Sequence, residues 1–325
     1  MYPPPPLDFN PEVADALKAG RPVVALSSAP IAHTLSWPEN LEIARLAEAA
    51  ARKEGAVLAV VAVWQGRLAI GLTAKQLEQL AHGTDSIRAS RRDLATVILR
   101  KQTASTTVSA SMYLAHRAGI PLLSTGAIGG AGHGSVGGWD VSADLVELSR
   151  TAVAVVCAGA RSVLDLARTC EILESYRVPV VGYGTEAFPA FYQRPGSQPA
   201  SVRVDSPAEA AVLLAAHWGM KGAGVVVAQP TPDAFALSPD MLQPALREVE
   251  HLASQTGLRA KDLPPLLMDR LNRLTKGRAL RAYRAILEAN TRLAARIARE
   301  LTSLRSEPGK PRSADASDAD SPSME

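Results

Sequence analysis

Short apolar runs alternate with helical segments between residues 22 and 228. The runs have the length and apolar character of buried strands, and they occupy residues 22–26, 120–125, 153–158, 178–183 and 224–228. Helical patterns separate them at residues 106–118, 142–150, 162–175 and 206–217. Because parallel strands are joined through helical crossovers, this alternation predicts an α/β fold with helices on both faces of a mostly parallel sheet.

The two ends of the chain differ from this central pattern. After Ala228 the signals are all helical, at 239–256, at 263–274 and in a long final helix, so we expect an all-helical C-terminal part. No linker divides residues 10–305, which predicts a single domain. Residues 306–325 have almost no large apolar side chains and are expected to form a disordered tail.

Composition excludes several classes of protein. The longest apolar run, 56–64, is far too short to cross a bilayer, and the N-terminus lacks the basic and apolar regions of a signal peptide. We therefore expect a cytoplasmic protein that does not interact with membranes. The chain has only Cys157 and Cys170, too few for a disulfide framework and without metal-ligand spacing, so both are expected to be reduced.

Basic residues are concentrated near the C-terminus. Residues 269–305 carry ten Lys or Arg and three acidic residues, a surplus that could suggest a polyanion partner. Leucines and isoleucines recur among the arginines at helical spacing, however, and Tyr283 is the only aromatic residue there. A solvated or subunit-facing amphipathic helix is the better interpretation, and a nucleic-acid partner is not expected.

A glycine-dense loop follows the apolar run 120–125. Seven of the thirteen residues from Gly126 to Gly138 are glycine, and such backbone lets a ligand approach closely. A flexible surface loop is the alternative interpretation. The loop does not lead directly into a helix and no P-loop lysine follows it, so the sequence does not support a nicotinamide or ATP site.

Polar clusters occur at four junctions between elements. They are Ser27-Ser28, residues 88–93, the glycine loop with Asp140, and Gly159-Ala-Arg161. An open α/β sheet binds its ligand where strands end and helices begin. We therefore expect these clusters to converge on one pocket.

Several strings of the chain resemble those of one enzyme family. They include IAHTLSWPENLEIA (31–44), SRRDL (90–94), GAIGG (126–130), DVSADLVEL (140–148) and AVVCAGARSVLDLART (154–169). In order and spacing they are similar to the pseudouridine-5′-phosphate glycosidases, the indigoidine synthase A-like C-glycosidases. The resemblance implies a homotrimer, a divalent metal such as Mn²⁺, and reversible cleavage of pseudouridine 5′-phosphate to uracil and ribose 5-phosphate.

This chain replaces two catalytic groups that the resemblance implies. The family lysine that holds ring-opened ribose phosphate as an imine corresponds to Arg161, and a guanidinium stays protonated and cannot form that bond. The family glutamate that exchanges protons with base and sugar corresponds to Ser27. An alcohol is not a general acid near neutral pH without an activating partner.

Other positions follow from the same resemblance. Asp140 corresponds to the metal-linked aspartate, and Arg88 replaces a family lysine while keeping its charge. Asp140 and Asp144 could instead flank the start of a helix, and Asn290 could serve packing. Of the histidines, His33 and His133 are the better site candidates. The expected substrate-binding residues are Arg88, Thr107, Val108, His133, Ser142, Ala143, Asp144 and Asn290.

Three hypotheses follow from these replacements. The first is a divergent, pseudoenzyme-like member that binds a ribose 5-phosphate or C-nucleotide type ligand, with C–C glycosidic cleavage lost or altered. The second is an active C-glycoside lyase or synthase with a rearranged site, through metal-assisted chemistry at Asp140 or C-nucleoside formation in a specialised pathway. A conventional glycosidase ranks last, because the nearest lysine, Lys101, falls on a predicted helix face.

Overall fold

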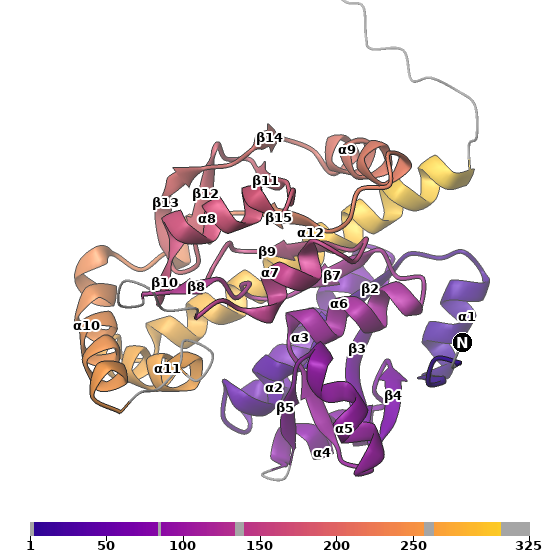
Figure 1. Ribbon diagram of the computed structural model, residues 1–325, viewed down its shortest axis with the longest axis horizontal. Helices are drawn as coiled ribbons and strands as arrows, with labels where there is room; N and C mark the ends of the chain where they lie inside the picture. The colour runs from indigo at the N-terminus through magenta and orange to yellow at the C-terminus, as the bar shows by residue number, and fades with distance from the viewer. Residues whose placement is uncertain (1–2, 84–85, 134–139, 257–262, 307–325) are drawn as a thin grey trace, which may run out of the picture.

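A mostly parallel sheet runs through the middle of the molecule, as the alternation of apolar runs and helices predicts (Figure 1). This computed structural model describes residues 3–83, 86–133, 140–256 and 263–306. In sheet order the main strands are β1 (Leu7–Phe9), β4 (Arg67–Ile70), β3 (Val57–Trp64), β2 (Val23–Ser27), β7 (Leu122–Ser124), β9 (Ala154–Cys157), β15 (Val225–Ala228), β11 (Val180–Tyr183) and β14 (Val202–Val204). β6 (Ala104–Thr106) pairs with β3, and β5 (Ile87–Ala89) pairs with β6.

Helices connect these strands and continue to the C-terminus. Those of the first half are α1 (Pro11–Lys18), α2 (Ala29–His33), α3 (Glu39–Lys53), α4 (Ala74–His82), the 3₁₀ helix η1 (Arg91–Asp93), α5 (Leu94–Leu99) and α6 (Val108–Arg117). Those of the second half are α7 (Ala143–Leu148), α8 (Leu166–Ser175), α9 (Pro207–Gly219), the 3₁₀ helix η2 (Asp233–Phe235), α10 (Pro239–Thr256), α11 (Leu263–Leu274) and α12 (Arg278–Ser306). The predicted all-helical C-terminal part is thus present.

Both faces of the sheet are buried, which explains why its central strands are continuously apolar. Successive side chains of a strand point to opposite faces. Val24, Leu122 and Val156 pack in one cluster with α9 and the second half of α12, while their neighbours Leu123 and Val155 belong to a second cluster that includes α6. The prediction of helices on both faces is therefore confirmed.

A hairpin forms where the sequence predicts one. β3 and β4 pair antiparallel, with Trp64 opposite Arg67. The two residues between them, Gln65 and Gly66, have φ of 49° and 79°. Positive φ at both central positions is the geometry of the two-residue turns that match strand twist.

The basic surface of α12 is largely paired within the chain. Arg296 and Arg292 lie 2.9 Å and 3.9 Å from the carboxylate of Glu54, at the end of α3, and Arg284 lies 3.1 Å from Glu42. The opposite side of α12 buries leucines and isoleucines. This arrangement agrees with an amphipathic helix whose charged side chains form ion pairs with the rest of the fold.

Some element boundaries differ from those predicted. The helix expected at 162–175 begins only at Leu166, because residues 164–165 form β10 (Leu164–Asp165), which pairs with β8 (Ala131–Gly132) of the glycine loop. Asp165 then caps α8 by accepting the Arg168 N–H at 3.0 Å. The sequence also did not predict the hairpin of β12 (Ala187–Ala190) and β13 (Gln193–Pro199).

The remaining predictions about organisation are tested only in part. None of the described helices is long and apolar enough to cross a membrane. Residue 306 belongs to α12, and the rest of the predicted tail lies outside the described residues. The single domain at 10–305 stays a prediction.

Candidate functional site

Three neighbouring parallel strands bring polar residues to one edge of the sheet. β2 ends at Ser27, β7 at Ser124 and β9 at Cys157, and these strands lie side by side. Because parallel strands end at the same edge, the segments that follow them meet there. Two adjoining cavities occupy this edge, and Thr107 and Arg161 line both of them.

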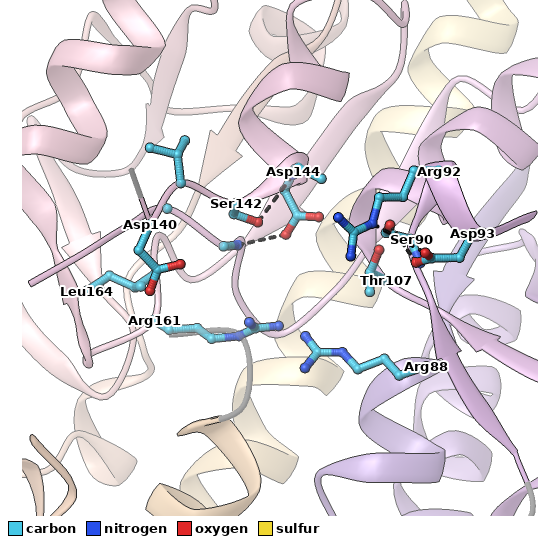
Figure 2. Close-up of a pocket in the computed structure, with 14 residues that line it drawn as sticks. Arg88, Ser90, Arg92, Asp93, Thr107, Asp140, Ser142, Asp144, Arg161 and Leu164 are labelled. Carbon is cyan, nitrogen blue, oxygen red and sulfur yellow. Dashed lines mark hydrogen bonds and ion pairs between the residues drawn. The ribbon is translucent and has the colours of Figure 1, made fainter. Parts of the chain in front are cut away.

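The outer cavity, of about 230 Å³, gathers most of the predicted polar residues. Figure 2 shows the side chains of Arg88 and Arg161 extending toward one another, with Asp140 beside the stem of Arg161. The predicted site residues that line this cavity are Arg88, Thr107, Asp140, Ser142, Ala143, Asp144 and Arg161. Residues of three of the four predicted junctions therefore meet in this cavity, and the fourth junction contributes Ser27 to the adjoining cavity.

The inner cavity, of about 40 Å³, brings the two substituted positions together. Ser27, Val108 and Arg161 all line it. The Ser27 hydroxyl lies 2.9 Å from the Thr125 hydroxyl, and both side chains are buried. On its other side stand the hydroxyl-bearing Tyr283 and the apolar residues Phe191, Leu267 and Met268.

Asp144 fixes the glycine loop to two helices. Its Oδ1 accepts the Ser109 N–H of α6 at 2.9 Å. Its Oδ2 accepts the Gly129 N–H of the loop, also at 2.9 Å (Figure 2). A Cβ at Gly129 would lie 2.2 Å from the Ser142 hydroxyl, so glycine is required here by the chain's own side chains. Asp144 thus positions the cavity wall as well as lining it.

Backbone N–H groups at the start of α6 are already engaged. The Thr107 N–H donates to the Ala89 carbonyl at 3.0 Å, and the Ser109 N–H donates to Asp144. An anion in the outer cavity would therefore be recognised chiefly by side chains, of which Arg88, Arg161 and the rim residue Arg92 carry positive charge.

The SRRDL string holds Arg88 in place from the following turn. Ser90 and Asp93 form a capping box, in which the Asp93 carboxylate accepts from the Ser90 N–H and hydroxyl at 2.8 Å. Arg91 reaches across to α7 and donates to both carboxylate oxygens of Glu147, at 2.8 and 3.0 Å. Its guanidinium also lies 4.5 Å from the ring centre of Tyr113.

Two predicted site residues, Asn290 and His133, lie away from the two cavities, as does Lys101. Asn290 is buried behind the loop, where it donates to the Thr125 carbonyl at 2.8 Å and accepts from Gln229 at 2.9 Å. Its role in the fold is to hold the loop's backbone. His133 is exposed, Lys101 is exposed just beyond α5 and not on a helix face as predicted, and neither is among the described lining residues.

His33 also lies outside these two cavities. It borders a separate cavity beside α11, and its Nε2 atom is buried without a hydrogen-bond partner in the described part of the chain. Burial lowers the pKa of its imidazole, although a hydrogen bond with Ile87 opposes the shift and the charge of Arg88 adds to it. His33 is therefore neutral near pH 7.

Burial sets the protonation of the groups near Arg161. It raises the pKa of the Tyr283 hydroxyl, and the positive charge of Arg161 offsets only part of that rise. Burial likewise raises the pKa of the Cys157 thiol to about 12. Both groups are neutral near pH 7, so Cys157 is an unreactive core thiol and Tyr283 is a hydrogen-bond donor.

Sequence reasoning missed the residues that the C-terminal helices contribute. Tyr283 comes from α12, and Leu267 and Met268 come from α11, more than a hundred residues beyond the glycine loop. Apolar and aromatic residues at helical spacing normally indicate core packing. The one available signal was that Tyr283 is the only aromatic residue in its basic helix.

The residues present fit a water-rich divalent site better than an all-protein cage. Within the described ranges, no group of three or more His, Cys, Asp or Glu side chains is placed to hold a metal. Both carboxylate oxygens of Asp144 accept backbone N–H groups, and Asp140 is a second carboxylate that lines the outer cavity. Mn²⁺ and similar hard ions bind such carboxylates and complete their coordination with water.

The comparison with protein families gives one match over most of the chain. The family described as "Indigoidine synthase A like protein" matches residues 12–300. The chain is 46% identical to pseudouridine-5′-phosphate glycosidase 2 of Rhizobium johnstonii, over 88% of this chain and 93% of that protein. It is 42% identical to pseudouridine-5′-phosphate glycosidase of Caldanaerobacter subterraneus subsp. tengcongensis, over 93% and 98%.

Solved structures resemble the whole fold. The prealnumycin C-glycosynthase AlnA, in complex with ribulose 5-phosphate, is 32% identical with a TM-score of 0.85, covering 94% of this chain and 99% of its own. An indigoidine synthase A-like protein of Thermotoga maritima is 29% identical with a TM-score of 0.82, covering 93% and 98%. The resemblance thus extends through the C-terminal helices that close the inner cavity.

Proposed function

The chain belongs to the family of indigoidine synthase A like proteins, and we propose that it binds a ribose 5-phosphate or C-nucleotide type ligand without the family's imine chemistry. Its C–C glycosidic cleavage is then lost or altered. Relatives named pseudouridine-5′-phosphate glycosidase, and the complex of AlnA with ribulose 5-phosphate, support a sugar phosphate as the ligand.

One observation carries this proposal. Arg161 and Ser27 line the same inner cavity, and none of the described residues that line this cavity is a lysine, histidine, aspartate or glutamate. A guanidinium remains protonated and a serine without a base is a poor proton donor, so neither supplies an imine or general acid–base catalysis. No other described side chain of the inner cavity replaces them.

The outer cavity is suited to the phosphate. Arg88 faces it from β5 and Arg92 lies on its rim, and guanidinium groups match phosphate oxygens through two parallel hydrogen bonds. Asp144 holds the glycine loop in place beside them. We assign the phosphate to this cavity and the rest of the sugar to the region near Thr107 and Arg161.

Asp140 is the residue that would hold a divalent cation, for which Mn²⁺ is our proposal. Such an ion would offset phosphate charge when bound. The protein's own contribution is to fix Asp140 at the cavity, where the carbonyl of this residue accepts the Gly132 N–H at 2.8 Å. We further propose that the chain forms a homotrimer, to be checked by sedimentation against the chain mass of 34.2 kDa.

An active C-glycoside lyase or synthase with a rearranged site is the second candidate. The similarity to AlnA, a C-glycosynthase at a TM-score of 0.85, favours it. In this alternative the neutral Tyr283 hydroxyl is a group of the inner cavity that can donate a proton to a ligand oxygen.

Calorimetric titration with ribose 5-phosphate, with and without Mn²⁺, tests the proposal. We expect saturable binding that Arg88→Gln weakens at least about tenfold, because a charge-assisted hydrogen bond contributes roughly 1.5–3 kcal/mol. Arg203→Gln, an exposed arginine on β14, is the matched control and should bind normally. Enhancement by Mn²⁺ should disappear in Asp140→Asn. Absence of binding at millimolar ligand would contradict the proposal.

A further inference from the structure

The described lining of the inner cavity includes one positively charged residue and no negatively charged one. Arg161 is its only charged residue in the described part of the chain. The other polar side chains are hydroxyls, including those of Ser27, Thr125 and Tyr283. All of these groups can donate hydrogen bonds, and none carries negative charge near neutral pH.

Arg161 differs from two nearby arginines in its ion pairing. Arg91 is paired with Glu147 and Arg92 with Asp93, whereas Arg161 makes no ion pair within the described ranges. Its side chain is half-buried and lines both cavities. A guanidinium stays protonated near neutral pH, so its positive charge remains in the cavity and stabilises an anion that enters.

We propose that the inner cavity binds a carboxylate, and that the ligand is therefore a phosphorylated sugar acid. This inference rests on the proposed function, which places the phosphate in the outer cavity. The cavities adjoin at Thr107 and Arg161, so one ligand can extend through both.

The chemistry of the cavity selects a carboxylate over other groups. A planar guanidinium donates two parallel hydrogen bonds to a carboxylate, and the hydroxyls of Tyr283 and Ser27 are further donors in the same wall. The space, about 40 Å³, suits a compact group of few atoms. An aldehyde or alcohol at this end carries no negative charge that could pair with Arg161.

Three ligands that differ only at the first carbon test the inference by calorimetry. They are ribose 5-phosphate, ribitol 5-phosphate and 5-phosphoribonate, which carry an aldehyde, an alcohol and a carboxylate. We expect 5-phosphoribonate to bind at least about tenfold more tightly than the other two, the effect of one charge-assisted hydrogen bond. Arg161→Gln should reduce this preference to within about threefold, and Arg203→Gln should retain it.

Tyr283→Phe provides a variant that keeps the charge and the ring. It should reduce the preference for 5-phosphoribonate a few-fold without changing the binding of ribitol 5-phosphate. Equal affinity of the normal protein for all three ligands would overturn the carboxylate assignment and leave the proposed function standing. Failure of all three to bind would instead contradict the proposed function, and this inference with it.

Discussion

At the scale of single residues, the character of the site is determined by Arg161 and Ser27. They come from the ends of β9 and β2 and line one inner cavity with Thr125 and Tyr283. The surrounding framework is intact, because Asp144 still secures the glycine loop and Asn290 still holds its backbone. The framework of the site is in place and only its reactive groups are exchanged. Restoring those groups should therefore restore catalytic activity.

The double variant Arg161→Lys with Ser27→Glu makes that expectation testable. An amine and a carboxyl together can form the imine and move the proton, so release of uracil from pseudouridine 5′-phosphate should rise at least about a hundredfold over the unaltered chain. Each single variant is a control and should stay near the starting rate, because such groups act as a unit. A double variant that binds the nucleotide and releases no uracil would favour the rearranged-site alternative.

At the scale of elements, close backbone contacts position the segment that carries Arg161. Gly159 has φ of +84°, and the Phe191 N–H donates to the Ala158 carbonyl at 2.9 Å. The segment after β9 is thereby held against β12.

Replacing Gly159 by alanine should disrupt this contact. The added Cβ would lie 1.7 Å from the Pro189 carbonyl oxygen, so we expect a loss of more than about 2 kcal/mol in the free energy of unfolding, measured in urea. Gly219→Ala is the matched control, because nothing lies within 4 Å of its added Cβ at the end of α9. That control should be neutral or stabilising by up to about 1 kcal/mol. Similar losses for both variants would disprove the steric argument.

The contact between α3 and α12 makes stability depend on pH. A hydrogen bond from Arg296 holds the pKa of the Glu54 carboxyl below its usual 4.5, although burial opposes that shift. Because the folded pKa is the lower one, the stabilisation is present above the unfolded pKa and is lost as the pH falls through the folded pKa.

Glu54→Gln should therefore destabilise the protein by about 0.5–1 kcal/mol at pH 7 in urea unfolding. The difference from the unaltered chain should shrink as the pH falls below 4.5, the ordinary pKa of glutamate. Glu78→Gln, an exposed residue of α4 without an ion pair in the described part of the chain, should show no such pH dependence. A constant difference at all pH values would contradict the assigned ion pairs.

At the scale of the whole molecule, the sequence predicted the sheet and its order of helices because both have strong local signals. Continuous apolar runs such as 153–158 identify strands buried on both faces, and the Gln65-Gly66 turn identifies its hairpin. β13 was missed because it contains Pro195 and Gly196, which normally indicate a loop.

The site was predicted where it depends on strand ends and missed where it depends on tertiary packing. Ser27, Thr107 and Arg161 follow strands, and the fold brings strand ends together. No local sequence signal indicates that Tyr283 of α12 and Met268 of α11 line the inner cavity. The same residues at the same spacing would also fit an ordinary core. The charge imbalance of the inner cavity became visible only in the assembled fold.

Borohydride reduction in the presence of saturating ribose 5-phosphate, read by intact mass, tests the central claim most directly. A chain that binds the sugar phosphate without an amine at the inner cavity should keep its unmodified mass, while the Arg161→Lys, Ser27→Glu variant gains one reduced sugar-phosphate adduct. A stoichiometric adduct on the unaltered chain would show that an imine still forms and would contradict the account.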